Sequence, residues 1–327
     1  MPRPRILPAF TAEQQEKAHQ LLGAKVAYMM GRKMEEGDWA DVYCKAKGLP
    51  NHGWSNLKLD VVYENLGVEH KMMCRPSKRS LTESCGTTIM HPSATRSIRV
   101  PPNSTPADDA MRDILTQYGD YLLARKEEVR KNAPAGTEPD MRIGWLLWQD
   151  NLHQFLYFEE EMMIPNPDDY YARWEVRVSK SVRKGSTNLW IYEKDTDKKR
   201  YSITTEAGAK VQPYFDVPPV GHPHLYVFNV IGEVITTELV RLWATEATAR
   251  ELRRILGDLL PETLSRSILA EAPVILRDDQ QGQGNEQVAE ALLISLEAYD
   301  ALRLALPDTV SDEHSLQLFA QHLRHKQ

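Results

Sequence analysis

Asp60, Glu69 and Lys71 place two carboxylates and an ammonium group in one short segment of the chain. Residues 68–73 alternate in character as a strand does, so Glu69 and Lys71 share one face and His70 takes the other. A hard divalent cation held by Asp60 and Glu69 could polarise a phosphate and activate a bound water. Lys71 could orient that water or stabilise charge on phosphorus. The pattern predicts metal-assisted phosphodiester hydrolysis.

A β-hairpin is the element that must position these groups. Residues 58–63 are rich in Val and Tyr and predict a strand, 65–67 carry turn residues, and 68–73 predict the returning strand. Folding the hairpin brings Asp60 beside the other two groups. A similar acid-x-Lys triplet at 197–199 lies in a turn without flanking apolar strands. The alternative interpretation of the first copy is an exposed hairpin with a cross-strand ion pair.

An aspartate followed by Glu-x-Lys across a hairpin resembles the PD-(D/E)XK nuclease superfamily, which includes most type II restriction endonucleases. Leu59 stands where the family has a proline. The resemblance implies that Asp60 and Glu69 bind Mg²⁺ and that Lys71 is the electrostatic or water-orienting group. It covers only this short motif.

Residues 11–36 predict a long helix, with Thr11 as its N-cap and Gly37 at its end. A helix before the catalytic hairpin recurs in the family and often directs an acid at the metal. Glu35 is the better candidate for that optional catalytic role. A solvated helix end is the alternative.

The order of elements predicts an α/β fold, with a mixed central β-sheet flanked by helices as in restriction endonucleases, and a helical C-terminal region. We expect residues 1–232 to form a nuclease core with DNA-reading insertions. We expect residues 233–327 to form a helical region, either packed on the same domain or separate from it. Expected helices cover 105–131, 239–256, 288–306 and 313–325, and expected strands 141–148, 155–162, 186–193, 200–205, 210–217 and 225–231.

The net charge of −6 is unevenly distributed, because residues 71–99 and 173–200 are rich in Lys and Arg. Two basic segments on an acidic body suit a protein that grips a nucleic-acid backbone on one face. Basic and amide side chains in the two segments are candidate DNA contacts, with a solvated surface loop as the alternative for the second segment: Arg75, Lys78, Arg79, Lys180, Arg183, Lys184 and Asn188.

Three cysteines, Cys44, Cys74 and Cys85, lack ligand-type spacing and predict reduced thiols. The sequence has no apolar run of membrane-spanning length and no secretory signal, so we expect a cytoplasmic protein without a membrane partner. It also lacks a dinucleotide-binding glycine loop, a Walker motif and a serine elbow, which argues against small-molecule metabolism.

These features together predict a Mg²⁺-dependent, sequence-specific double-stranded DNA endonuclease of the type II restriction kind. Cleavage of both strands of a palindrome favours a homodimer, for which the apolar residues 289–306 offer an interface. A repair or phage-defence nuclease with the same core is one alternative. A noncatalytic DNA-binding or assembly protein is another.

Overall fold

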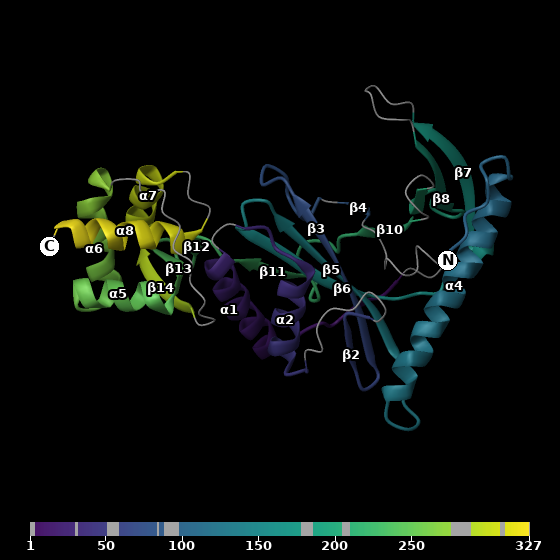
Figure 1. Cartoon of the computed structure of the whole chain (residues 1–327), viewed down its shortest axis with the longest axis horizontal. Helices are drawn as coiled ribbons and strands as arrows, with labels where there is room; N and C mark the ends of the chain where they lie inside the picture. The colour runs from purple at the N-terminus through teal and green to yellow at the C-terminus, as the bar shows by residue number, and fades with distance from the viewer. Residues whose placement is uncertain are drawn as a thin grey trace.

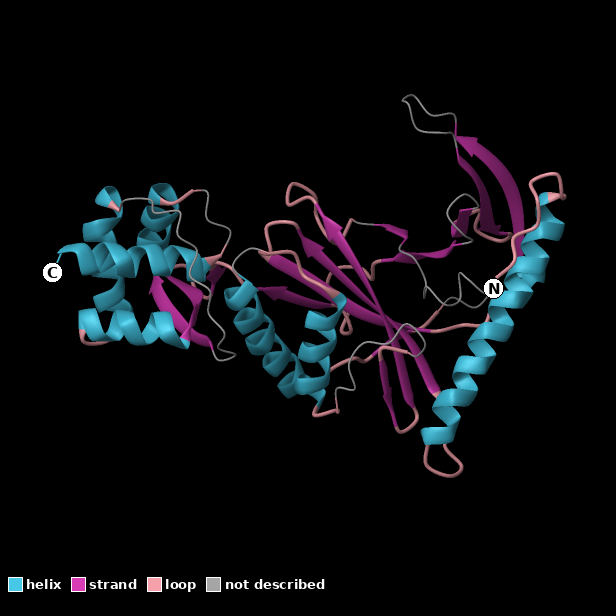
Figure 2. Ribbon diagram, in the orientation of Figure 1, coloured by secondary structure: helices cyan, strands magenta, loops and turns pink. Residues whose placement is uncertain are grey.

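A mixed β-sheet lies at the centre of the molecule (Figures 1 and 2). The computed structural model describes residues 4–29, 32–50, 59–83, 85–87, 98–177, 186–204, 210–275, 289–307 and 311–326. The sheet has the order β1-β6-β5-β3-β2, and β11 pairs with the same outer edge of β6 as β1. Its strands are β1 (Ile6–Leu7), β2 (Val61–Tyr63), β3 (Leu66–Arg75), β5 (Asp140–Gln149), β6 (Gln154–Glu161) and β11 (Tyr226–Asn229).

The direction of each strand follows from the length of its connection. Short turns join β2 to β3 and β5 to β6, and both pairs are antiparallel. The long connection from β3 to β5 contains helix α4 (Ala107–Asn132), and it makes β3 and β5 parallel over ten residue pairs. The parallel pair fixes Glu69 beside Ile143 and Lys71 beside Trp145.

Helices α1 (Ala12–Met29) and α2 (Glu36–Lys47) cover one face of this sheet. Their buried side chains, including Trp39 and Tyr43, pack with Val68, Leu146 and Tyr157 from the strands. The other face packs against α4 and a second sheet. The two faces therefore bury different residues of β3.

The second sheet is antiparallel, with the order β4-β10-β9-β8-β7. Its inner side chains, among them Leu189, Ile203 and Phe215, join the core formed by α4 and the first sheet. A short 3₁₀ turn, η1 (Pro167–Asp169), leads into it. Its strands are β4 (Cys85–Thr87), β7 (Tyr170–Arg177), β8 (Ser186–Glu193), β9 (Lys199–Thr204) and β10 (Lys210–Asp216).

Beyond Gly232 the chain builds a three-stranded antiparallel sheet covered by helices, at the opposite end of the molecule from α4 (Figure 1). This unit has its own hydrophobic core, and Trp243 packs against Gly23 of α1. Its elements are β12 (Glu233–Val234), β13 (Leu239–Thr245), α5 (Glu246–Leu256), α6 (Pro261–Glu271), η2 (Ala272–Val274), β14 (Ala289–Ser295), α7 (Leu296–Ala305) and α8 (Asp312–Lys326).

The predicted α/β class with a mixed sheet flanked by helices is confirmed, as are the hairpin and the helix at 105–131. Three expectations are wrong. The helix expected over 11–36 ends at Met29, and a new helix starts at Glu36. The helices expected over 239–256 and 288–306 both begin as strands, so the C-terminal region is not purely helical. Pairing of β13 with β14 along seven residues overrides the helical propensity of their alanines.

Helix α4 is the longest described helix, with 26 residues. Its apolar stripe (Met111, Ile114, Leu115, Tyr118) faces the core, and charged residues occupy the remaining surface. Neither it nor any other helix in the described ranges has the length and apolar character needed to cross a bilayer.

The close packing of the first sheet generates a stability prediction at Gly144. A Cβ added there would overlap the hydroxyl of Tyr157 and lie 2.7 Å from His70 Cδ2. We expect Gly144→Ala to lower the free energy of unfolding by about 1–3 kcal/mol, measured by urea denaturation. Gly37→Ala is the matched control, since nothing lies within 4 Å of its added Cβ in α2. Equal stabilities of the two variants would contradict this packing.

Candidate functional site

Asp60 directly precedes β2, and the hairpin places it alongside β3. A two-residue turn at Glu64 and Asn65 joins the strands, and Val61, the first residue of β2, pairs with Val68 of β3. Asp60 Oδ2 then accepts a hydrogen bond of 2.7 Å from the backbone N–H of His70. The carboxylate takes the place of a strand partner, which fixes it beside Glu69.

Glu69 and Lys71 form an ion pair beneath the surface. Lys71 Nζ lies 2.7 Å from Glu69 Oε1, and the two residues are 4% and 3% exposed, respectively. No described group donates a hydrogen bond to Glu69 Oε2, although that atom is buried. One oxygen of Glu69 is therefore committed to the lysine, and the other is available.

Burial raises the pKa of Asp60 to about 7, and the nearby carboxylate of Glu69 adds to the effect. Lys71 and the His70 N–H act in the opposite direction without cancelling it. Asp60 therefore changes charge near neutral pH, unlike an exposed aspartate.

Burial and neighbouring charges have opposite effects on the pKa values of Lys71 and Glu69. Burial would lower the pKa of Lys71, but the carboxylates of Glu69, Asp60 and Glu36 outweigh it and raise that pKa. Burial raises the pKa of Glu69 by more than Lys71 lowers it. A cation close to Asp60 and Glu69 would favour the charged form of both carboxyl groups.

His70 lies on the opposite face of β3, as predicted. Its ring packs edge-on against Tyr43 at 4.8 Å and against Tyr157 at 6.0 Å between centroids. Burial lowers its pKa to about 3, so the imidazole is neutral. His70 is a packing residue and supplies only its backbone N–H to the site.

Glu36, rather than Glu35, is the acidic residue of α2 with a demonstrable effect on the site. Glu35 is the N-cap of α2, and its N–H donates to the Asp38 carboxylate at 3.0 Å. Glu36 is exposed, and its charge raises the pKa values of Asp60, Glu69 and Lys71. The acids at 35, 36 and 38 have the signature of a helix start, which could have placed the helix boundary and hence Glu36.

The basic residues of the first segment lie at and beyond the end of β3. Arg75 ends β3 and is partly buried, and Lys78 and Arg79 are exposed in the loop that follows. Arg75 stands four positions after Lys71 in the strand, which is a distance of about 13 Å. DNA that contacts both groups would lie along β3.

The structure describes only part of the second basic segment. Lys180, Arg183 and Lys184 lie outside the described residues. Asn188 is in strand β8 and is 5% exposed, so its amide is not in a surface loop. The expected loop placement of Asn188 is wrong, because its strand pairs with β7 and β9 in the second sheet, and its expected contact with DNA stays a prediction.

The described ranges contain no cluster of three or more His, Cys, Asp or Glu side chains arranged to hold a metal ion. Asp60 and Glu69 supply two carboxylates, and the third group beside them is Lys71. This composition fits a cation that keeps most of its water ligands, as Mg²⁺ does, better than one that needs a closed protein cage.

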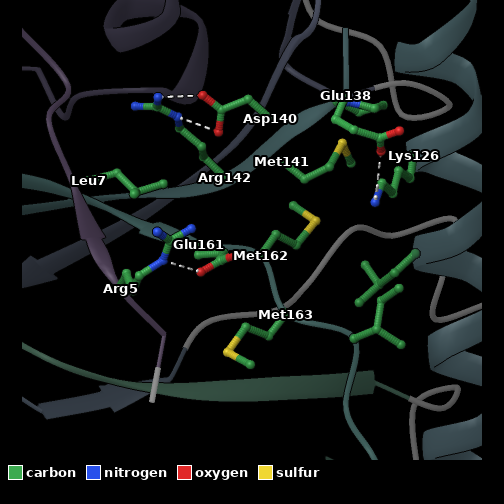
Figure 3. A pocket seen from close by; sticks show the side chains of 13 residues that line it. Arg5, Leu7, Lys126, Glu138, Asp140, Met141, Arg142, Glu161, Met162 and Met163 are labelled. Atoms are coloured by element: carbon green, nitrogen blue, oxygen red, sulfur yellow. Dashed lines mark hydrogen bonds and ion pairs between the residues drawn. The ribbon is translucent and has the colours of Figure 1, made fainter. Parts of the chain in front are cut away.

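A cavity of about 490 Å³ between β1, α4 and the neighbouring ends of β5 and β6 lies apart from these residues (Figure 3). Met141, Met162 and Met163 form much of its wall. The charged side chains around it are paired, as Arg5 is with Glu161 at 2.9 Å and Lys126 with Glu138 at 3.7 Å. It contains none of the predicted catalytic groups.

No protein-family model, curated protein or solved structure matches the chain. Its function is therefore inferred from the geometry and chemistry of the site around Asp60, Glu69 and Lys71.

The raised pKa of Asp60 generates a prediction about stability in metal-free buffer. The folded protein holds this proton up to about pH 7, whereas the unfolded chain releases it near 3.8. Between those values folding binds a proton, so Asp60 makes stability fall as pH rises, and the loss is complete above about 7. Asp60→Asn keeps an acceptor for the His70 N–H and removes the titration.

We expect the melting temperature of Asp60→Asn, relative to the unmodified protein, to rise between about pH 4 and about pH 8. Thermal denaturation at a series of pH values measures it. A difference between the two proteins that stays constant across this range would contradict the burial of Asp60.

Proposed function

We propose that the protein is a divalent-metal-dependent DNA endonuclease, with Asp60, Glu69 and Lys71 as its catalytic residues. The observation that carries the proposal is the buried Lys71–Glu69 pair at 2.7 Å with the Asp60 carboxylate held beside it by the His70 N–H. Two carboxylates and one ammonium at the end of a hairpin are the groups that phosphodiester hydrolysis requires.

Mg²⁺ fits the available oxygens. Glu69 Oε2 accepts no described hydrogen bond, and the only described bond to the Asp60 carboxylate goes to Oδ2. When bound there, the cation would polarise a phosphate and lower the pKa of a coordinated water.

The protein's own groups would supply charge and position. Lys71 would stabilise negative charge on the phosphorus or orient the attacking water. Glu69 holds Lys71 in place through its Oε1. Asp60 must lose its proton before it can serve as a ligand, so proton and metal compete for it near neutral pH.

We further propose double-stranded DNA as the substrate and the type II restriction class as the biological setting. Arg75, Lys78 and Arg79 would contact the backbone where β3 ends. A symmetric homodimer would supply the two active sites that a palindrome needs. These steps extend the resemblance of the motif, and a repair or phage-defence nuclease would use the same catalytic groups.

One observation favours a noncatalytic alternative. The ammonium of Lys71 already bonds to Glu69, and both side chains are almost fully buried. Under the noncatalytic alternative, this ion pair would only stabilise the fold, and the protein would bind DNA or take part in an assembly without cleaving DNA. Single substitutions separate the two functions.

We expect purified protein with Mg²⁺ to cut plasmid DNA into discrete fragments, and Glu69→Gln to lower the cleavage rate by roughly 10²-fold or more. Lys71→Met should do the same, because charge stabilisation is lost. Removing one partner of a buried ion pair destabilises a fold, so the double variant Glu69→Gln, Lys71→Met is the control for folding. Gel electrophoresis measures cleavage and circular dichroism the fold. Unchanged cleavage in all three variants would exclude this site.

The two acids at the start of α2 form a matched pair for a second test. Glu36→Gln removes a negative charge that acts on Asp60, Glu69 and Lys71, so we expect weaker binding of a divalent cation at the site. Glu35→Gln should leave metal affinity unchanged. Calorimetric titration with Mn²⁺ measures the metal affinity of the two variants. A loss of Mn²⁺ affinity in Glu35→Gln but not in Glu36→Gln would instead indicate that Glu35 assists metal binding.

A further inference from the structure

A second cavity, of about 200 Å³, lies between the first sheet, the second sheet and the chain segment that leaves β6. Its wall includes Glu160 of β6, Tyr118 of α4 and Tyr201 of β9. Neither the catalytic proposal nor any sequence motif accounts for it.

The carboxyl group of Glu160 is the most unusual feature of this cavity. Glu160 is 8% exposed, and its Oε1 accepts a hydrogen bond of 2.8 Å from Trp145 Nε1. Glu160 lines the cavity, so a ligand there could bond to the carboxyl oxygen that Trp145 does not use.

Burial raises the pKa of Glu160 to about 7, and the hydrogen bond from Trp145 and the charge of Arg200 offset this effect only in part. Asp216 raises it slightly further. The group therefore holds a proton at and below neutral pH. A protonated carboxyl has a donor and an acceptor side by side.

Aromatic rings form one wall. Tyr201 packs edge-to-face with Tyr118 at 6.1 Å and with Tyr170 at 5.7 Å between ring centroids. Ile143 and Met163 add apolar surface. Such a wall suits a flat ring.

The charges around the cavity argue against an anionic ligand. Arg200, the one arginine in its lining, already bonds to Glu193 at 2.5 Å and lies 3.5 Å from Asp216. Asp169 and Glu161 also line the cavity. A phosphate inside would meet these acids and an arginine that is already paired, so the described lining disfavours an anionic ligand.

We propose that this cavity binds a nucleobase, with the Glu160 carboxyl bonded to the donor and acceptor on one edge of the base and the tyrosines against its face. Bases outside a duplex are bound in other proteins by this combination of edge hydrogen bonds and aromatic packing. The inference goes beyond cleavage and holds whether or not the Asp60 site hydrolyses DNA. The base could belong to a free nucleoside or be turned out of a DNA duplex.

The test compares Glu160→Gln with Glu160→Leu. Glutamine keeps an acceptor and a donor, whereas leucine keeps only the shape. Calorimetry with the four deoxynucleosides, and fluorescence anisotropy with duplexes that carry one unpaired base, measure binding without divalent metal. We expect Glu160→Gln to bind within about threefold of the unmodified protein and Glu160→Leu to bind at least about tenfold more weakly.

The nucleosides and the unpaired-base duplexes distinguish a free nucleoside from a base turned out of DNA. Glu160-dependent binding of nucleosides alone indicates a free ligand, and Glu160-dependent preference for the unpaired-base duplex over a perfect duplex indicates a base from DNA. Ile164→Trp, at the cavity lining, should block either form without touching the carboxyl. Melting temperatures confirm that the variants fold.

Equal binding by Glu160→Leu and the unmodified protein, or no binding of any probe, would overturn the proposal. The same measurements on Glu69→Gln distinguish it from the nuclease proposal. Loss of cleavage with intact base binding leaves this inference standing, and intact cleavage without base binding removes it alone.

Discussion

The ion pair between Lys71 and Glu69 is the interaction on which the arrangement of the site depends. Each charge would cost several kcal/mol to bury alone, so neither side chain could occupy this position without the other. Their spacing of two residues on one strand holds them together at 2.7 Å. Because Lys71 uses only one oxygen of Glu69, the pair leaves the second oxygen buried and unmatched beside Asp60.

Helix α4 makes that burial possible. It connects β3 to β5 and makes them parallel, and it packs over the face that bears Glu69. Its residue Tyr118 is buried within the electrostatic influence of both Glu69 and Glu160. The candidate catalytic groups and the carboxyl of the second cavity therefore lie on one face of one sheet, on different strands, under the same helix.

The hairpin and its polarity could be predicted because strand alternation is local. Glu69 and Lys71 had to share a face and His70 the other, and the pairing of β2 with β3 fixed Asp60. The boundary between α1 and α2 was missed because residues 11–36 carry a continuous helical pattern, and the sequence-based prediction therefore named Glu35 and not Glu36, which lies at the start of α2.

Other features depend on partners far away in sequence. The strand character of Ala289–Ser295 comes from pairing with β13, and Asn188 is buried by strands on both sides. The local sequence does not indicate that Glu160 is buried, because the residue stands in a run of three glutamates. Its burial depends on Trp145 and the second sheet. Local pattern predicted which side chains the hairpin brings together, and long-range packing determined which other side chains surround them.

A crystal soaked in Mn²⁺ near pH 8 tests the central claim most directly, since the metal can be located by its anomalous scattering. At that pH Asp60 is above its pKa of about 7 and can act as a ligand. The account predicts one peak between the Asp60 carboxylate and Glu69 Oε2, with Lys71 still bonded to Glu69 Oε1. A peak elsewhere, or none beside these two carboxylates at saturating Mn²⁺, would contradict it.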